Sequence, residues 1–121
     1  MAIKNRPEFE KFIRRVEKSS DEFRASSTEK RHSKQYRTAR ENLAHLVDEN
    51  SFLEFGQFAV AAQRSRRDYE ELQDKTNADG IITGFCSVNS ELVGAENSQA
   101  VAIVYDYSVL AGTQGAFHHL K

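Results

Sequence analysis

Apolar residues recur at helical spacing in the first part of the chain. Proline at position 7 suits a first helical turn, where its missing N–H would be unpaired anyway. The stripe that follows predicts an amphipathic helix over about residues 7–25; its members are Phe9, Phe12, Ile13, Val16 and Phe23. A second stripe predicts a helix over about 30–47, which the turn formers DENS end; its members are Tyr36, Ala39, Leu43, Leu46 and Val47.

The second part of the chain has the pattern of strands. FLEFGQFAV (52–60) predicts a short strand, and the polar stretch 61–78 predicts a surface loop with room for one helical turn. The β-branched and aromatic run DGIITGFCSVN (79–89) predicts another strand after an Asp-Gly turn. Residues 90–100 read as a connector. VAIVYDYSVL (101–110) is almost continuously apolar, which is typical of a central strand buried on both faces.

This order predicts an α/β fold in which helices cover a small sheet. Apolar strands need helices or a second sheet over them, and only two helices precede the sheet. A small glycine-flanked turn and an incipient helix follow the last strand. The final FHHLK has no helix stop signal, so we expect the fold to be incomplete at this end.

Composition narrows the class of protein. The chain is 39% hydrophobic and 29% charged, with a net charge of -1, as in soluble globular proteins. No apolar run approaches membrane-span length, and no signal-peptide core follows the N-terminus. A single cysteine suits a reducing cytoplasm. Residues 1–75 hold 16 Lys and Arg against 14 Asp and Glu, and residues 76–121 hold 1 against 4. Neither imbalance argues for nucleic acid.

The strand-to-helix junction AGTQG (111–115) is the first candidate site. Its two glycines allow backbone N–H groups to approach a ligand closely, and a helix N-terminus after them would favour an anion. Small-residue turns after strands are also common without any function, and the residues alone favour such a purely structural turn.

The remaining polar candidates each have a structural alternative. His118 and His119 could serve as metal ligands or a general base, but we expect exposed histidines on a helix surface. RSRR (64–67) could bind a phosphate or an acidic partner, although such basic clusters in polar loops are usually only solvated. Asp106 interrupts an apolar strand and is either a structural cap or close to a site. Cys86 reads as a small core residue.

Three segments, taken in order, resemble the carboxyltransferase subunits of biotin-dependent acyl-CoA carboxylases. They are ARENLAHLVDENSFLEF (39–55), ADGIITGFCSVNSELV (78–93) and AIVYDYSVLAGTQGAFHHLK (102–121). The propionyl-CoA, methylcrotonyl-CoA and acetyl-CoA carboxylases are of this type. The chain departs from the pattern at Asn50, where the family's turn has glycine, and at Ala111, which replaces the first glycine of the junction. Asn tolerates the left-handed backbone needed at such a turn.

The resemblance implies a fold, an activity and partners. It implies an N-terminal helical arm (1–50) and the first part of a crotonase-like β-β-α spiral (51–121). Such subunits are several times longer, so the chain is expected to be an N-terminal fragment. The parent activity is carboxyl transfer from carboxybiotin to the α-carbon of an acyl-CoA: carboxybiotin releases CO2, the α-carbon loses a proton, and the enolate attacks. Implied partners are acyl-CoA, the biotin carboxylase and carrier domains, and further copies of the chain.

The resemblance also assigns roles within this chain. Residues expected to line the acyl-CoA side of the site are Ala111, Gly112, Thr113, Gln114 and Gly115, and those expected near CoA phosphates are Arg64, Arg66 and Arg67. No catalytic or metal residue is expected, because the family's oxyanion-stabilising glycine pair follows a later strand. The chain alone is therefore expected to be inactive and to bind no biotin. Two alternatives stay open: a non-catalytic oligomerisation role, and a parent that is an acyl-CoA decarboxylase or another crotonase-superfamily enzyme. The identity of the acyl chain also stays open.

Overall fold

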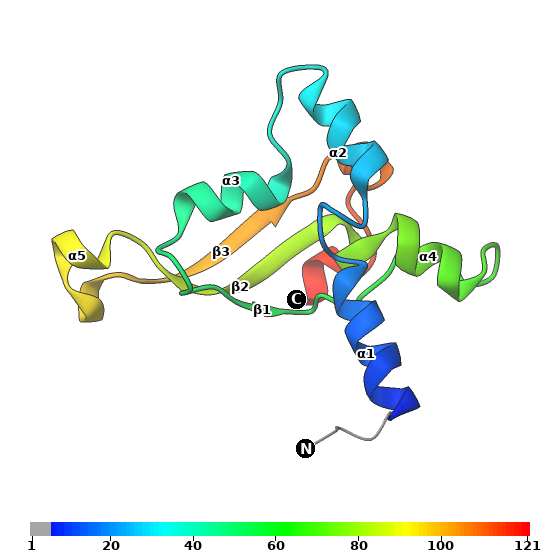
Figure 1. The fold of residues 1–121 in the computed structure, drawn as a ribbon, viewed down its shortest axis with the longest axis horizontal. Helices are drawn as coiled ribbons and strands as arrows, with labels where there is room; N and C mark the ends of the chain where they lie inside the picture. Colours follow the sequence, from blue (N-terminus) through cyan, green and yellow to red (C-terminus); the bar gives the residue numbers. More distant parts are fainter. Residues whose placement is uncertain (1–5) are drawn as a thin grey trace.

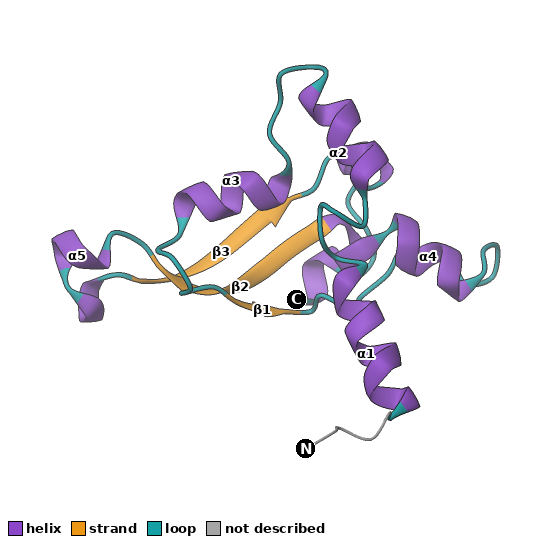
Figure 2. Cartoon of the chain, viewed as in Figure 1, coloured by secondary structure: helices purple, strands orange, loops and turns teal. Residues whose placement is uncertain are grey.

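The computed structural model describes residues 6–121 and shows a three-stranded sheet with helices around it (Figures 1 and 2). The strand order is β1-β2-β3, and both pairings are antiparallel. The strands are β1 (Leu53–Phe55), β2 (Ile81–Ser87) and β3 (Gln99–Tyr105). The helices are α1 (Pro7–Glu17), α2 (Ala25–His32), α3 (Ala39–Leu46), α4 (Tyr69–Lys75) and α5 (Ser90–Val93). The predicted α/β class is confirmed.

The N-terminal half contains three helices rather than the two predicted. The helix expected over 7–25 ends at Glu17, after which Ser19 and Ser20 bond back to helix carbonyls. The helix expected over 30–47 is divided into α2 and α3, because Thr38 starts a new helix with a reciprocal capping box to Glu41. Such a box satisfies two backbone N–H groups that no helical carbonyl can reach, so it fixes a boundary that an apolar stripe does not reveal.

The region before β2 is also more helical than expected. The strand predicted over 52–60 is only β1, since Gly56 adopts a positive φ of 69° directly after it. Asp68 caps α4, which fills the centre of the predicted loop with about two helical turns. Leu72 on α4 is fully buried against Val60 and Ala61. This second small core explains the order in a stretch that reads as polar.

β2, and not β3, is the central strand. The prediction that residues 101–110 are buried on both faces was wrong. Alternate side chains of β3 are exposed, at 53% for Val101, 61% for Ile103 and 54% for Tyr105. Only one face of β3 packs on α3, and within residues 6–121 β3 pairs with β2 alone. A continuous apolar run therefore reflects here one buried face and one uncovered apolar face.

α3 covers the opposite face of the sheet and makes the main core. Ala39 and Leu43 of α3 pack on Ile82, Cys86 and Ala102. Cys86 is a buried core residue, as predicted. Gly84 is required in β2 because a Cβ there would lie 2.4 Å from the Phe52 ring. The part of the chain that the structure describes has no helix both long and apolar enough to cross a lipid bilayer.

Asp48 ties the end of α3 to the end of β2. Its carboxylate accepts hydrogen bonds from the Ser87 hydroxyl (2.7 Å) and from the backbone N–H groups of Asn89 (2.8 Å) and Ser90 (3.0 Å). Asn50, in the turn that follows, has a φ of 58°, which confirms that asparagine serves there in place of glycine. Hydrogen bonding, chiefly from Ser87, lowers the pKa of Asp48 to about 2.

Asp48→Asn is expected to reduce the dependence of the free energy of unfolding on pH in the acid range. Because the pKa of Asp48 is lower in the folded chain, the stabilisation is complete above about pH 4 and is lost as the pH falls towards about 2. Urea unfolding followed by circular dichroism between pH 2 and 6 measures this. Identical pH dependence in the wild type and the variant would contradict the assignment.

Candidate functional site

An ion pair joins the N-terminal helices to the end of the sheet. The Arg24 guanidinium, just before α2, donates to Asp106 Oδ2 (2.8 Å) and to Ser108 Oγ (2.7 Å). Asp106 Oδ1 accepts from the backbone N–H (2.9 Å) and hydroxyl (2.5 Å) of Ser108. The Arg24 and Asp106 side chains are only 10% and 14% exposed. Asp106 is therefore structural, and we call Arg24, Asp106 and Ser108 the bridge.

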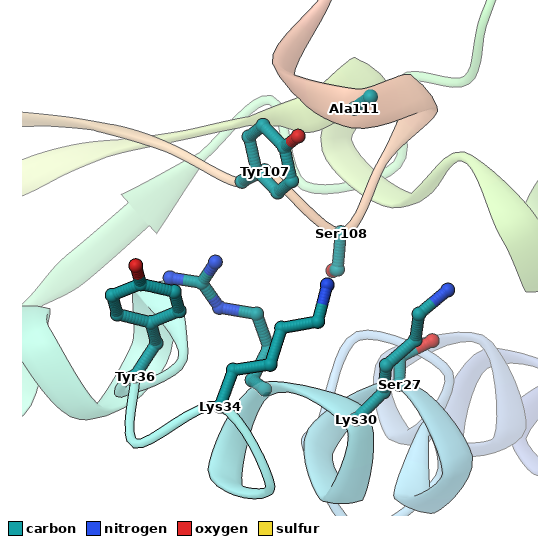
Figure 3. Close-up of a pocket in the computed structure, with 8 residues that line it drawn as sticks. Ser27, Lys30, Lys34, Tyr36, Tyr107, Ser108 and Ala111 are labelled. Atoms are coloured by element: carbon teal, nitrogen blue, oxygen red, sulfur yellow. The ribbon is translucent and has the colours of Figure 1, made fainter.

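A cleft lies between α2 and the segment after β3 (Figure 3), and the bridge reaches it through Ser108, which is one of its lining residues. The cleft has a volume of about 630 Å³, which is within the usual range for a small-molecule site. The Lys34 side chain extends from the loop after α2 towards Ser108, while Lys30 and Tyr36 lie on either side of it. The lining residues are Ser27, Lys30, Arg31, Lys34, Tyr36, Tyr107, Ser108 and Ala111.

The lining has the chemistry of an anion site with aromatic walls. It contains three cations, Lys30, Arg31 and Lys34, and no carboxylate among the described lining residues. The Arg31 guanidinium lies 5.0 Å from the centroid of Tyr36 and 5.6 Å from that of Tyr107, close enough for cation–π attraction. Its Nε and Nη2 donate to the Arg37 carbonyl, which holds the guanidinium in place. Phosphate groups and a flat ring would both find partners here.

The predicted glycine turn (111–115) meets the cleft at one end. Ala111 lines the cleft with a φ of 55°, although it lacks the freedom of the glycine it replaces. Gly112 lies against the Tyr107 ring, and the Thr113 hydroxyl donates to the Leu110 carbonyl. Gln114 is exposed, and Gly115 lies beside Asp79, away from the lining residues. Their predicted contact with acyl-CoA stays a prediction.

The predicted phosphate-binding arginines lie elsewhere. Arg64 stacks over Tyr69, with 4.6 Å between the guanidinium carbon and the ring centroid. Arg67 pairs with Glu71 at 2.9 Å, and Arg66 is exposed in the same loop before α4. None of the three lines the cleft. Their proposed role with CoA phosphates stays a prediction.

One histidine differs from its expectation. His119 is exposed, but His118 is buried at 6% exposure, because the residues after the glycine turn fold back onto the end of the sheet. Its ring lies edge-on to Tyr105, with centroids 5.8 Å apart. Residues 6–121 contain no cluster of three or more His, Cys, Asp or Glu side chains suited to a metal ion.

The cations of the cleft were missed by sequence reasoning. The stretch SSTEKRHSK reads as a polar break, yet Lys34 follows Lys30 by four residues and Arg31 by three, the spacings that bring side chains together on a helical path. That spacing is a signal, but it is shared by many solvated helix faces. Tyr36 and Tyr107 distinguish this group of cations from a solvated helix face, and these two residues come together only in the folded chain.

Solved structures of known proteins share this fold. The chain superposes on a solved single-chain, multi-domain long-chain acyl-CoA carboxylase with a TM-score of 0.92 and 46% identity, covering 96% of this chain and 12% of that one. Transcarboxylase 12S, solved as a hexamer with hydrolysed methylmalonyl-coenzyme A bound, matches with a TM-score of 0.59 and 28% identity over 79% of this chain and 17% of its own.

A sequence relative points the same way. The methylmalonyl-CoA decarboxylase subunit alpha of Veillonella parvula is 31% identical over 93 residues, 77% of this chain. The chain is similar to one segment of each of these longer proteins. The predicted resemblance is thereby confirmed, although no family model matches the chain. The chain spans only 12% to 17% of the length of these relatives.

Arg24→Ala is expected to destabilise the chain by about 3 kcal/mol, because it leaves the largely buried Asp106 carboxylate without its countercharge. Urea unfolding at pH 7 measures the change. Lys11→Ala is the matched control, since its ion pair with Glu8 is exposed and contributes little. A loss for Arg24→Ala no larger than that of the control would contradict the structural role of the bridge.

Proposed function

We propose that the chain is the acyl-CoA-binding opening segment of a biotin-dependent carboxyltransferase. The whole protein would transfer a carboxyl group from carboxybiotin to the α-carbon of an acyl-CoA. The cleft is the observation that carries this proposal. Coenzyme A bears a diphosphate, a further phosphate and an adenine ring, and the cleft offers Lys30, Arg31 and Lys34 beside Tyr36 and Tyr107. Charge-assisted bonds and ring stacking suit these two chemical groups.

The cleft residues do not fit biotin. The bicyclic ring of biotin is neutral, and three cations without a carboxylate among the described lining residues favour an anion instead. We therefore assign biotin no residue of this chain, and derive no step through it. In the proposed whole enzyme, biotin would be presented on a carrier domain and carboxylated by a biotin carboxylase.

The wider assembly is part of the same proposal. We infer a helical arm at residues 1–50, and strands that open a crotonase-like spiral at 51–121, in a cytoplasmic homo-oligomer. The uncovered apolar face of β3, and its edge that is unpaired within residues 6–121, support contact with further protein, since the strand has neither charge nor proline to block pairing. The described residues provide acyl-CoA contacts and no catalytic group, so the chain alone is expected to be inactive.

A decarboxylase parent is the second candidate. The 31% identity to a methylmalonyl-CoA decarboxylase subunit favours it, because that relative carries the same segment. Both candidates require an acyl-CoA on the residues described here. Loss of carboxyl from a carboxyacyl-CoA by the whole protein, without transfer to an acceptor acyl-CoA, would favour the decarboxylase.

Free CoA is expected to bind the chain through the cleft. Lys30→Ala and Lys34→Ala should each raise the dissociation constant by about tenfold, because each removes a cation that bonds a phosphate. Isothermal titration calorimetry with CoA and with 3′-dephospho-CoA measures this and shows which phosphate each lysine contacts.

Lys11→Ala serves again as the control, since Lys11 lies on α1 outside the cleft. Unchanged CoA affinity in both cleft variants, or an equal loss in Lys11→Ala, would contradict the proposal. An effect confined to Arg64, Arg66 and Arg67 variants would instead place the phosphates at the loop before α4.

A further inference from the structure

The loop that enters β2 holds three consecutive residues in the left-handed region. Their φ angles are 55° at Ala78, 49° at Asp79 and 77° at Gly80. Glycine adopts this conformation freely, but alanine and aspartate each adopt it at a cost. Strained backbone persists only where the surroundings over-determine it, and it gathers near functional sites. Contacts with other parts of the chain must therefore hold the loop in this conformation.

Asp79 is the centre of the contacts that hold this loop. It is 2% exposed, and its Oδ2 accepts a hydrogen bond from the Phe117 backbone N–H at 2.9 Å. Its own N–H donates to the carbonyls of Ala59 and Thr76. The carboxylate also fills the space next to Gly115, where an added Cβ would lie 2.2 Å from Oδ2 and 2.3 Å from Oδ1. Residue 115 therefore has no room for a side chain.

The residues after the glycine turn close over the same loop. The Lys121 ammonium donates to the carbonyls of Ala78 and Ile81, both at 2.6 Å. The buried His118 ring lies against Gly80, with Nε2 3.2 Å from where a Cβ would be. Asp79 Oδ1 and both ring nitrogens of His118 have no protein partner in the described part of the chain. Buried polar groups left in this way are costly, so packing alone does not account for them.

We propose that Asp79 is a positioning residue for the glycine turn, and so for the wall of the acyl-CoA cleft. The choice of acyl-CoA as the ligand rests on the proposed function, whereas the contacts of Asp79 do not depend on it. Asp79 fixes the chain at two points, the N–H of Phe117 and the bare backbone of Gly115. These two points set the path of residues 111–117, whose first member, Ala111, lines the cleft. The strain at residues 78–80 aims the carboxylate at both points.

A double-mutant cycle tests the contact with Gly115. Gly115→Ala should lower the melting temperature of the wild-type chain, because its new Cβ collides with the Asp79 carboxylate. The same substitution in an Asp79→Ala background should produce a clearly smaller shift, since the obstructing carboxylate is gone. Equal shifts in the two backgrounds would overturn the contact. If Asp79→Ala does not fold, Asp79→Ser keeps the cycle measurable because it also removes the colliding oxygens.

Hydrogen exchange tests the contact with Phe117 without any ligand. Asp79→Asn should raise the exchange rate of the amides of residues 111–121 by severalfold, and Asp79→Ala by about tenfold, the loss of one hydrogen bond to a charged group. Asn gives the smaller effect because its side-chain oxygen still accepts. Amides at the centre of β2 should exchange as in the wild type, which a general loss of stability would not allow.

Asp68→Ala is the matched control. Its carboxylate also accepts one backbone N–H, that of Glu70, but it caps α4 instead of the glycine turn. It should leave exchange at residues 111–121 unchanged. An equal increase in this control, or no increase in Asp79→Ala, would overturn the positioning role.

CoA titration separates this inference from the proposed function. Asp79→Asn should weaken CoA binding severalfold with Lys30 and Lys34 intact. If the wild-type chain does not bind CoA at all, the proposed function fails, while the exchange and melting results still decide whether Asp79 positions the turn. If CoA binds the wild type and Asp79→Asn equally well, the link from Asp79 to the cleft is wrong.

Discussion

An ion pair across 82 positions of sequence sets the relation between α2 and the segment after β3. Arg24 precedes α2 and Asp106 follows β3, and their contact, shared with Ser108, is among the most buried charge pairs in the described residues. Burying two charges costs desolvation free energy. Removing only one of them destabilises the fold further, because the other charge is left buried without a partner. Its value lies in specificity, because it gives one fixed distance between two elements that otherwise meet little.

The cleft follows from that distance. With Arg24 anchored, α2 carries Lys30, Arg31 and Lys34 past the end of β3, where Tyr107 and Ala111 form the other wall. The chain after this wall is held separately, where Phe117 bonds to Asp79 and Lys121 bonds to the Ala78 carbonyl. Two polar anchors, one on each side of the segment after β3, therefore define the candidate site. The apolar core beneath α3 shares no residue with the lining of the cleft in the described part of the chain.

Some features were predictable because they are local. The α/β class, the buried Cys86, the turn at Asn50 and the family resemblance all depend on short stretches of sequence. The division of the second helix and the existence of α4 were not, since they depend on side-chain caps at Thr38 and Asp68 that compete with an apolar stripe. The central position of β2 was missed because apolar character does not distinguish a strand paired on both sides from one with an uncovered face. The cleft needs residues from both halves of the chain, which no local pattern joins.

The most direct test of the account is a nuclear magnetic resonance titration of the 121-residue chain with free CoA. The account predicts that backbone and side-chain shifts change mainly at the cleft, in α2, at Tyr36 and from Tyr107 to Ala111. Changes confined to Arg64, Arg66 and Arg67, or no saturable changes at all, would contradict the claim that the bridge builds an acyl-CoA site.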